Sequence, residues 1–360
     1  MLCVADKYIP YLKGRIDKYF DKVLYLEPSE ITCEVLYNCD ILLIRTRTKC
    51  NQSLLEGTKV KFIATATIGT DHIDMEYCRR QGIMVCNAPG CNARGVAQYV
   101  ESALFQLGIR NLELGIRSEE FRIKNDVKTI GIIGVGHVGS LVFETAKRLG
   151  LKTLLYDPPR QRNEGGNQWT TDLFDVAKKS DIITVHTPLT NDGDDKTYHL
   201  IDSDFLKHCK PNAIIINAAR GGIIDEAALM SIYSERARRH APTMIRNNSQ
   251  LSTFNNSQLS TFNFQLILDT WENEPDINID LLNITTIATP HIAGYSDEGK
   301  RNATRMILEQ LAEYLHCEID TTDLATSHEP LPVYDIMRDD QSFRANPQDF
   351  ERLRQQYHFR

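Results

Sequence analysis

Short apolar runs rich in β-branched residues alternate with amphipathic, helix-length stretches along most of the chain. The first series of runs is LCVA near Met1, KVLYL at 22–26, ILLIR at 41–45, KFIAT at 61–65 and IMVC at 83–86. The second series is KTIGIIG at 128–134, followed by TLLYD, DIITVH, AIIIN, QLILD and TTIATP. Strands separated by helical segments predict parallel sheets built of βαβ units, and two such series predict two α/β domains.

Two longer amphipathic segments flank the second series. Residues 92–115 place apolar side chains on one helical face, namely Val96, Val100, Ala103, Leu104 and Leu107. Residues 296–316 read as a second helix that opens on Ser296, a residue type favoured at helix N-caps. Both helices are predicted to cross between the domains, so that the chain returns to its first domain after completing the second.

One polar segment interrupts this pattern. Residues 247–262 repeat the octapeptide NNSQLSTF twice in tandem. A tract of this composition buries too little apolar surface to order itself, so it is interpreted as an insertion tolerated in a surface loop. A docking loop is the alternative interpretation.

Composition excludes several classes of protein. No apolar run approaches the length of a membrane span, and the first residues lack the pattern of an export signal. The net charge of −7 disfavours a nucleic-acid binder, and an anionic ligand must therefore be held by a local group of positive side chains. The nine cysteines include no Cys-x-x-Cys pair, so they indicate reduced thiols and no zinc site. The chain is expected to be a cytoplasmic enzyme without a metal and without nucleic-acid or membrane partners.

The second series opens with a glycine-rich turn in the context of a dinucleotide site. Gly134, Gly136 and Gly139 follow an apolar strand and open a helix whose first amides belong to His137 and Val138. The next strand ends in Asp157, at the position of the acidic residue of the Gly-x-Gly-x-x-Gly fingerprint. Such glycines let the backbone approach a pyrophosphate, and the helix N-terminus attracts it. Asp157 would accept ribose hydroxyls and repel a 2′-phosphate, which favours NAD, although the nearby Arg160 leaves NADP open.

Three ionisable residues follow later strands and form a candidate catalytic set. Arg220 follows AIIIN, Glu274 lies in DTWENEP, and His291 lies in ATPHIAG. An arginine fork binds a carboxylate, a histidine removes a hydroxyl proton as hydride leaves the same carbon, and a carboxylate orients the ring. Taken alone, His291 is more typical of a hydrogen-bonded structural histidine, and only the combination points to catalysis.

The ordered motifs resemble those of the D-isomer-specific 2-hydroxyacid dehydrogenase family. The glycine fingerprint is followed by HTPL, NAARGG, DTWENEP and TPHIAG, and the resemblance extends from about residue 35 to residue 316. It implies that Arg220 binds the substrate carboxylate, that Glu274 pairs with the base and that His291 is the acid/base, with Glu272 as the competitor of Glu274.

The resemblance also implies an architecture. Two flavodoxin/Rossmann-like domains are expected, with the active site in the cleft between them. Residues 1–92 and 291–318 are predicted to form the catalytic domain, residues 93–290 the NAD-binding domain, and residues 319–360 a shortened C-terminal dimerisation region.

Further stretches resemble one branch of that family, which oxidises 4-phospho-D-erythronate in pyridoxal 5′-phosphate biosynthesis. These stretches are RTRTKCNQSLLEG, KFIATATIGTDHID, HIAGYSDEGK and the tail that begins LPVYDIMRDD. The match implies substrate contacts at Thr46, Thr67 and Tyr295. It implies cofactor contacts at Asp157, Thr187, Ala218, Ala219, Arg220, Asp269 and Gly294.

Candidate phosphate ligands come from the residues themselves. Arg45, Arg47 and Lys49 alternate at a predicted strand end, so they are expected to project from one face, and Arg338 and Arg344 in the tail are further candidates. A homodimer is expected from the tail. The remaining alternatives are another dehydrogenase of the family, acting on 3-phosphoglycerate or a simple 2-hydroxy acid, an NADH-responsive binding protein, and an inactive enzyme.

Overall fold

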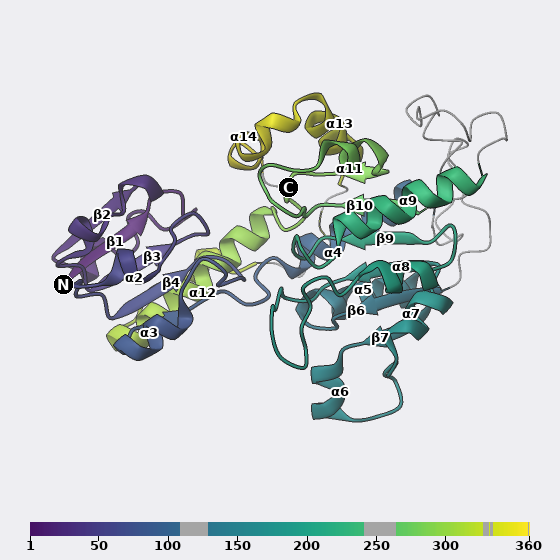
Figure 1. Ribbon diagram of the computed structural model, residues 1–360. Helices are drawn as coiled ribbons and strands as arrows, with labels where there is room; N and C mark the ends of the chain where they lie inside the picture. Colours follow the sequence, from purple (N-terminus) through teal and green to yellow (C-terminus); the bar gives the residue numbers. More distant parts are fainter. Residues whose placement is uncertain (109–128, 241–263, 327–330, 332–333, 359) are drawn as a thin grey trace. The chain divides into compact units, whose positions relative to one another are not determined.

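The two series of apolar runs form two separate parallel sheets in the computed structural model, which describes residues 1–108, 129–240, 264–326, 331, 334–358 and 360 (Figure 1). The chain divides into two compact units. One comprises residues 1–95, 295–331 and 359–360, and the other comprises residues 96–294 and 332–358. The unit edges at 95 and 294 lie three and four residues from the predicted domain edges at 92 and 290, whereas the edge at 331 lies well beyond the predicted one at 318. The tail, predicted as a region of its own, is shared between the two units.

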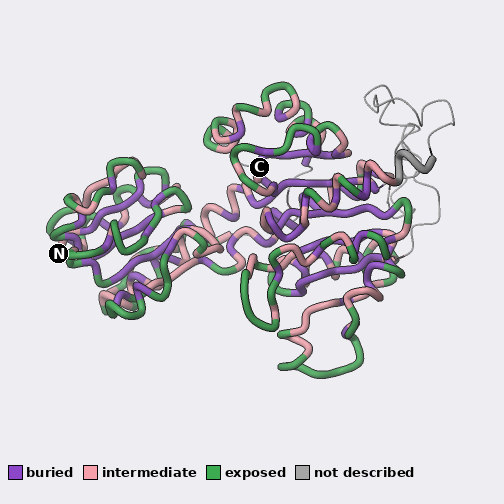
Figure 2. Tube along the Cα trace, viewed as in Figure 1, coloured by how far each residue is buried: buried purple, intermediate pink, exposed green. Residues whose placement is uncertain are grey.

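The sheet of the first unit has the strand order β2-β1-β3-β4-β5, with all neighbours parallel. Its strands are β1 (Leu2–Asp6), β2 (Lys22–Leu26), β3 (Ile41–Ile44), β4 (Phe62–Thr65) and β5 (Met84–Cys86). Its helices are α1 (Cys33–Leu36), α2 (Gln52–Leu55), α3 (Met75–Gln81) and α12 (Asp297–Leu315), with 3₁₀ turns at Asp17–Tyr19, Pro28–Glu30 and Thr322–Leu324. Strands β3 and β4 are buried throughout, because apolar side chains pack on both faces of the sheet (Figure 2).

The sheet of the second unit has the order β11-β10-β9-β8-β6-β7, again parallel. Its strands are β6 (Thr129–Ile133), β7 (Lys152–Tyr156), β8 (Ile182–Val185), β9 (Ile214–Asn217), β10 (Gln265–Leu268) and β11 (Ile287–Ala288). The order reverses between β6 and β8. Ligands of open parallel sheets bind at such a point, beyond the carboxyl ends of the strands.

Helices cover both faces of this second sheet. The helices of the second unit are α5 (His137–Arg148), α6 (Pro158–Glu164), α7 (Leu173–Lys179), α8 (Ser203–His208), α9 (Glu226–His240), α11 (Ile279–Ile284), α13 (Ile336–Ala345) and α14 (Phe350–Gln355). Helix α4 (Ala93–Gln106) enters from the first unit, and a 3₁₀ turn spans Pro347–Asp349.

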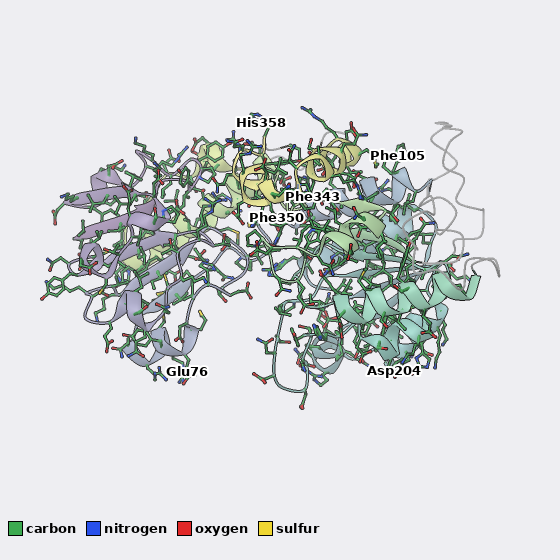
Figure 3. All side chains as sticks on the ribbon, turned by 45° about the horizontal axis from the view of Figure 1, so that its top comes forward. Glu76, Phe105, Asp204, Phe343, Phe350 and His358 are labelled. Carbon is green, nitrogen blue, oxygen red and sulfur yellow. The ribbon has the colours of Figure 1, made fainter. Side chains whose placement is uncertain are left out.

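The tail helices α13 and α14 are part of the core of the second unit. Phe343 and Phe350 are fully buried, with ring centroids 5.6 Å apart (Figure 3), and Phe343 packs edge-on against Trp271. The Ala288 N–H of β11 donates to the Asp340 carboxylate at 2.7 Å. The tail therefore closes the β11 edge of the sheet within the same chain.

The predicted strands are all present in the structure, and so are two α/β units. The helix predicted at 296–316 is α12, capped by the Ser296 hydroxyl, which accepts the Gly299 N–H at 3.1 Å. The helix predicted at 92–115 is α4, which ends at Gln106. Part of that prediction and the duplicated octapeptide at 247–262 lie outside the described residues.

Candidate active site

His291 lies in a loop after β11 that is fixed from several sides. Its N–H donates to the Asp269 carbonyl oxygen at 2.7 Å, and its φ of 56° is a left-handed conformation. The buried Asp269 carboxylate accepts the Thr289 hydroxyl (2.7 Å) and the N–H groups of Ile292 (2.8 Å) and Ala293 (2.9 Å). These hydrogen bonds hold the loop in place, so His291 keeps its unfavourable left-handed backbone conformation. The position of its imidazole is fixed as a result.

Thr289 links this loop to its surroundings. Its hydroxyl lies 2.8 Å from that of Tyr99, and its carbonyl oxygen accepts the Trp271 indole N–H at 2.9 Å. Burial raises the pKa of Asp269, while the charge of His291 and the hydrogen bonds that the carboxylate accepts act in the opposite direction.

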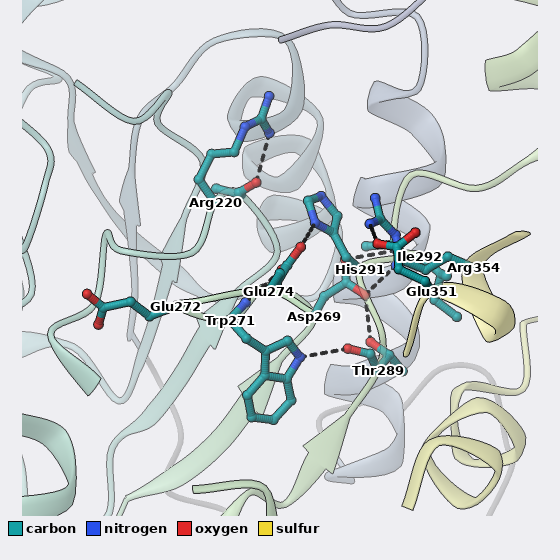
Figure 4. A network of polar contacts seen from close by, with 12 residues as sticks. Arg220, Asp269, Trp271, Glu272, Glu274, Thr289, His291, Ile292, Glu351 and Arg354 are labelled. Atoms are coloured by element: carbon teal, nitrogen blue, oxygen red, sulfur yellow. Dashed lines mark hydrogen bonds and ion pairs between the residues drawn. The ribbon is translucent and has the colours of Figure 1, made fainter. Parts of the chain in front are cut away.

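Glu274 and His291 form a direct pair (Figure 4). Glu274 Oε2 lies 2.8 Å from His291 Nδ1, and Glu274 Oε1 accepts the Trp271 N–H at 2.9 Å. Burial acts to raise the pKa of Glu274, but His291, the Trp271 N–H and the charge of Arg354 outweigh it, so the pKa is lowered. Glu274 is therefore ionised at neutral pH and stabilises positive charge on the imidazole.

Glu272, the competing glutamate, takes no part in this pair. Its side chain points away from His291 in Figure 4, and its Oε1 lies 3.1 Å from His199 Nε2. The structure thus brings Glu274 to His291 and directs Glu272 to a different histidine.

Arg220 lies on a separate loop of the same unit, after β9. Asn217 shapes this loop, because its side chain donates to the Arg220 carbonyl oxygen (2.9 Å) and accepts the Ala219 N–H (3.1 Å). The guanidinium donates to the Ala219 carbonyl oxygen at 2.9 Å. Strands β9, β10 and β11 are adjacent and parallel, so the loops that carry Arg220, Glu274 and His291 meet at one edge of the sheet.

The glycine-rich turn after β6 is shaped to accept a ligand. A Cβ at Gly134 would lie 2.8 Å from the His186 carbonyl, and one at Gly139 would lie 2.0 Å from the Gly134 oxygen, whereas a Cβ at Gly136 would meet open space. Gly136 is the N-cap of α5, whose first residues are His137 and Val138, and no side chain of the described residues caps this helix. The open side of Gly136 and the uncapped amides fit a pyrophosphate.

Polar atoms beside this turn also fit a cofactor. The Thr187 hydroxyl and His186 Nδ1 are buried without a hydrogen-bond partner in the described part of the chain, and β8, which they follow, flanks the point where the strand order reverses. Burial lowers the pKa of His186 to about 3, so this imidazole is neutral. Ala218 and Ala219 are buried after β9, and Gly294 is buried at the end of the His291 loop.

Asp157 and Arg160, which bear on the choice of cofactor, have distinct surroundings. The Asp157 carboxylate accepts the Val135 N–H (2.8 Å) and the Arg160 N–H (3.0 Å). The Arg160 guanidinium binds Glu164 (2.7 Å) and the Val135 carbonyl oxygen, and it lies over the ring of Trp169. Arg160 is thus occupied by protein groups, which weakens the case for it as a 2′-phosphate ligand.

The candidate substrate contacts at the β3 and β4 ends belong to the first unit. These strands are neighbours, so Thr46 and Thr67 follow adjacent strand ends. Thr46 is exposed, and the Thr67 hydroxyl donates to the Gly69 carbonyl oxygen at 3.1 Å. Arg45 is partly buried and donates to the Tyr8 carbonyl oxygen at 3.2 Å.

The predicted alternation of Arg45, Arg47 and Lys49 is wrong. Strand β3 ends at Ile44, and the Thr48 N–H donates back to the Arg45 carbonyl oxygen, so the segment turns instead of extending. Side chains on a turn do not share a strand face, and the three cations are not aligned as the sequence suggested.

Tyr295 and Arg344 complete the predicted set. Tyr295 is partly buried in the first unit, with Lys300 Nζ 3.9 Å from its ring centroid. Arg344 binds Asp340 (2.9 Å) and the carbonyl oxygens of Leu282 (2.8 Å) and Thr285 (2.6 Å) at the end of α11. It anchors the tail, which argues against its use for a substrate phosphate.

Two residues near the site were not anticipated from the sequence. His199 contacts Glu272, and Glu226, at the start of α9, accepts the Glu272 N–H at 2.7 Å. Neither residue is part of a recognisable sequence motif, because both contact Glu272 from loops that are far away in the chain. In the described residues, no group of His, Cys, Asp and Glu could hold a metal ion, and no helix is long and apolar enough to cross a membrane.

Comparisons with known proteins extend along the whole chain. A family model described as D-isomer specific 2-hydroxyacid dehydrogenase, NAD binding domain, matches residues 108–243. The erythronate-4-phosphate dehydrogenase of Bacteroides fragilis is 41% identical, over 100% of this chain and 97% of that protein. The protein of the same name from Porphyromonas gingivalis is 37% identical, over 99% of this chain and 92% of that protein.

A solved structure agrees at the level of the fold. The D-lactate dehydrogenase of Aquifex aeolicus, complexed with NAD and lactic acid, aligns with a TM-score of 0.66 over 91% of this chain and 100% of that chain. Its sequence is 22% identical, so this likeness concerns the fold alone.

Proposed function

The chain belongs to the D-isomer specific 2-hydroxyacid dehydrogenase family, and from this premise we propose that it oxidises 4-phospho-D-erythronate at C2 with NAD. The product is (R)-3-hydroxy-2-oxo-4-phosphooxybutanoate, and the reaction serves pyridoxal 5′-phosphate biosynthesis. The observation that supports this substrate is the similarity, along the entire chain, to proteins named for it. The relatives that match along the chain at 41% and 37% identity are named for erythronate 4-phosphate, which favours this substrate over 3-phosphoglycerate.

The geometry of the second unit supports an acid–base role for His291. Glu274 holds Nδ1 of the ring, which leaves Nε2 to take the proton of the C2 hydroxyl as the carbonyl forms. The ionised Glu274 stabilises the resulting imidazolium. Arg220 binds the substrate carboxylate through its planar fork and orients C2.

NAD, when bound, accepts the hydride that leaves C2. Residues that would hold it are the glycines and first amides of α5, together with Asp157, Thr187, Ala218, Ala219, Arg220, Asp269 and Gly294. The open side of Gly136 and the Thr187 hydroxyl, which has no hydrogen-bond partner among the described residues, support this assignment. Asp157 at the end of β7 favours NAD over NADP, because a carboxylate repels a 2′-phosphate.

The substrate contacts are proposed from the first unit. Thr46, Thr67 and Tyr295 would contact the hydroxyl groups and the tail of the substrate, and Arg45 is retained as a phosphate ligand. Support comes from the strand order β2-β1-β3, which makes the ends of β1 and β3 a point of reversal where ligands bind.

We also propose a cytoplasmic location and a homodimer. All nine cysteines are free thiols, as is usual for proteins of a reducing compartment. The tail supports dimerisation only through its resemblance to a dimerisation segment, since in this chain α13 and α14 pack within the second unit.

The test is single-turnover reduction of NAD by excess enzyme offered 4-phospho-D-erythronate or 3-phosphoglycerate. Single turnover separates chemistry from slow product release. A burst with phosphoerythronate alone is expected. A burst with 3-phosphoglycerate alone would keep the family and overturn the substrate, and silence with both despite NADH binding would favour a binding protein or an inactive enzyme.

A further inference from the structure

A second histidine–glutamate pair lies beside the proposed catalytic pair and takes no part in its chemistry. His199 Nε2 lies 3.1 Å from Glu272 Oε1, and His199 Nδ1 lies 3.6 Å from Asp225 Oδ2. The Tyr198 ring stacks on the imidazole at 3.9 Å between centroids and an angle of 16°. Only 28% of the His199 side chain and 23% of the Glu272 side chain are exposed, so solvent screens this pair less than an ordinary surface ion pair.

His199 is attached by its backbone to the loop that carries Arg220. Its N–H donates to the Gly222 carbonyl oxygen at 2.8 Å. Further along, Ile201 and Ile224 form a parallel bridge, so the two segments run together. Through its ring, the same residue contacts Glu272, which lies two positions before Glu274.

The two loops also touch directly. A Cβ at Gly221 would lie 1.9 Å from the Trp271 carbonyl oxygen, so the backbones are in close contact at that point. Below the contact, the buried Glu226 carboxyl accepts the Glu272 N–H at 2.7 Å. The junction therefore joins three segments, namely 198–201, 220–226 and 271–274.

We infer that His199 is a positioning residue, which with Glu272 holds the Arg220 loop against the segment that presents Glu274. It thereby fixes the substrate-binding guanidinium relative to the Glu274–His291 pair. The inference rests on the proposed function for the roles of Arg220, Glu274 and His291, whereas the junction itself is a property of the fold. A displacement of about 1 Å between such groups costs roughly a hundredfold in rate.

The experiment compares His199→Ala and His199→Gln with wild type, and uses His208→Ala as the matched control. His208 lies on α8 in the same unit and is exposed. It contacts the carbonyl oxygen of Asp204 (2.8 Å; labelled in Figure 3) and the edge of the Phe174 ring, and neither residue belongs to the junction. Two properties are measured: kcat and KM for 4-phospho-D-erythronate with the Kd for NADH, and amide hydrogen exchange of the segments 219–225 and 271–274.

His199→Ala is expected to lower kcat/KM by roughly 10- to 100-fold, through both kcat and KM, and to raise the NADH Kd, because the loosened loop also carries the proposed cofactor contacts Ala219 and Arg220. Exchange of both segments should accelerate. His199→Gln keeps an N–H that can donate to Glu272, so it should recover most of the rate and protection, and His208→Ala should match wild type.

Wild-type rates and exchange in His199→Ala would overturn the inference, as would a glutamine variant no better than alanine, since packing alone would then explain the loss. If wild type turns over neither phosphorylated acid, the proposed function fails. Amide hydrogen exchange in the segments 219–225 and 271–274 then still decides whether His199 holds them together.

Discussion

The Trp271–Glu274 segment presents two glutamates that each bind a histidine, and the two pairs differ in what surrounds the rings. The pairs are nearly equal in contact distance, 2.8 Å for Glu274–His291 and 3.1 Å for Glu272–His199. Their histidines are equally exposed, at 29% and 28%. Neither distance nor exposure identifies the catalytic pair.

The difference lies in the second ring nitrogen. Carboxylates face both nitrogens of His199, those of Glu272 and Asp225. Among the described residues, a carboxylate meets His291 only at Nδ1, that of Glu274, at the strand edge where Arg220 also lies (Figure 4). A ring with carboxylates on both sides is suited to joining segments, whereas a ring held on one side can exchange a proton with a substrate.

The largest expected effect separates the two histidines. His291→Ala should lower the single-turnover rate by about 10²- to 10⁴-fold, because it removes the proton acceptor, and should leave NADH binding nearly unchanged. His199→Ala should lose less and should raise the KM for substrate as well. Equal losses with equal KM values would abolish the distinction between the pairs.

The next effect separates the two glutamates. Glu274→Gln should lower the rate about a hundredfold, because the charge that stabilises the imidazolium is gone. For the same reason, the pH below which oxidation slows should move downward. Glu272→Gln should leave that pH unchanged and cost about tenfold or less. The measurement is single-turnover rate against pH for both variants, and a shift in the Glu272 variant would contradict the assignment.

The strands could be predicted from the sequence because apolar runs alternate with amphipathic segments. Few arrangements bury both the apolar runs and the apolar faces of the amphipathic segments. The sequence also anticipated the positions of Arg220, Glu274 and His291 because parallel strands deliver their ends to one edge. Residue types and spacing alone do not decide between Glu272 and Glu274, and it was the resemblance to the family that favoured Glu274. The direction of each side chain depends on a turn whose contacts come from the distant residues His199 and Glu226.

Other limits have the same physical origin. The cations after β3 seemed to alternate because the sequence does not reveal that the strand ends at Ile44. Arg160 and Arg344 looked available as phosphate ligands, but Glu164 and Asp340, each four residues away on the same helix, bind them. A pattern of residue types thus does not show which charged side chains pair with one another, whether locally on a helix or across the fold.

A third effect concerns the carboxyl beneath Glu272. Burial, together with the charges of Glu272 and Glu274, raises the pKa of Glu226 to about 7, although the hydrogen bond from the Glu272 N–H acts to lower it. The folded protein therefore binds a proton more tightly than the unfolded chain, so stability is highest below the unfolded pKa and falls as pH rises toward 7. Because the pKa rises from an ordinary value of 4.5 to about 7, the full loss attributable to Glu226 should be about 3 kcal/mol.

Urea unfolding at pH 5 and pH 8 measures this loss, and Glu226→Gln should remove most of the difference between the two values. Glu274 contributes with the opposite sign, because its pKa is lowered and its contribution disappears only in acid. If the free energy of unfolding of Glu226→Gln depended on pH as strongly as that of wild type, the titrating group would be a residue other than Glu226.

The smallest effect tests the outer partner of His199. Asp225 lies 3.6 Å from His199 Nδ1, and its other oxygen accepts the Ala228 N–H at 2.8 Å, at the start of α9. Asp225→Asn keeps the oxygen that the helix uses and changes only the group near the ring. Because the contact is long and its carboxylate partly exposed, kcat/KM should fall by about threefold or less. Should Asp225→Asn cost as much as His199→Ala, the junction would depend on Nδ1 and not on Glu272, and both histidines would then be held through the same ring nitrogen.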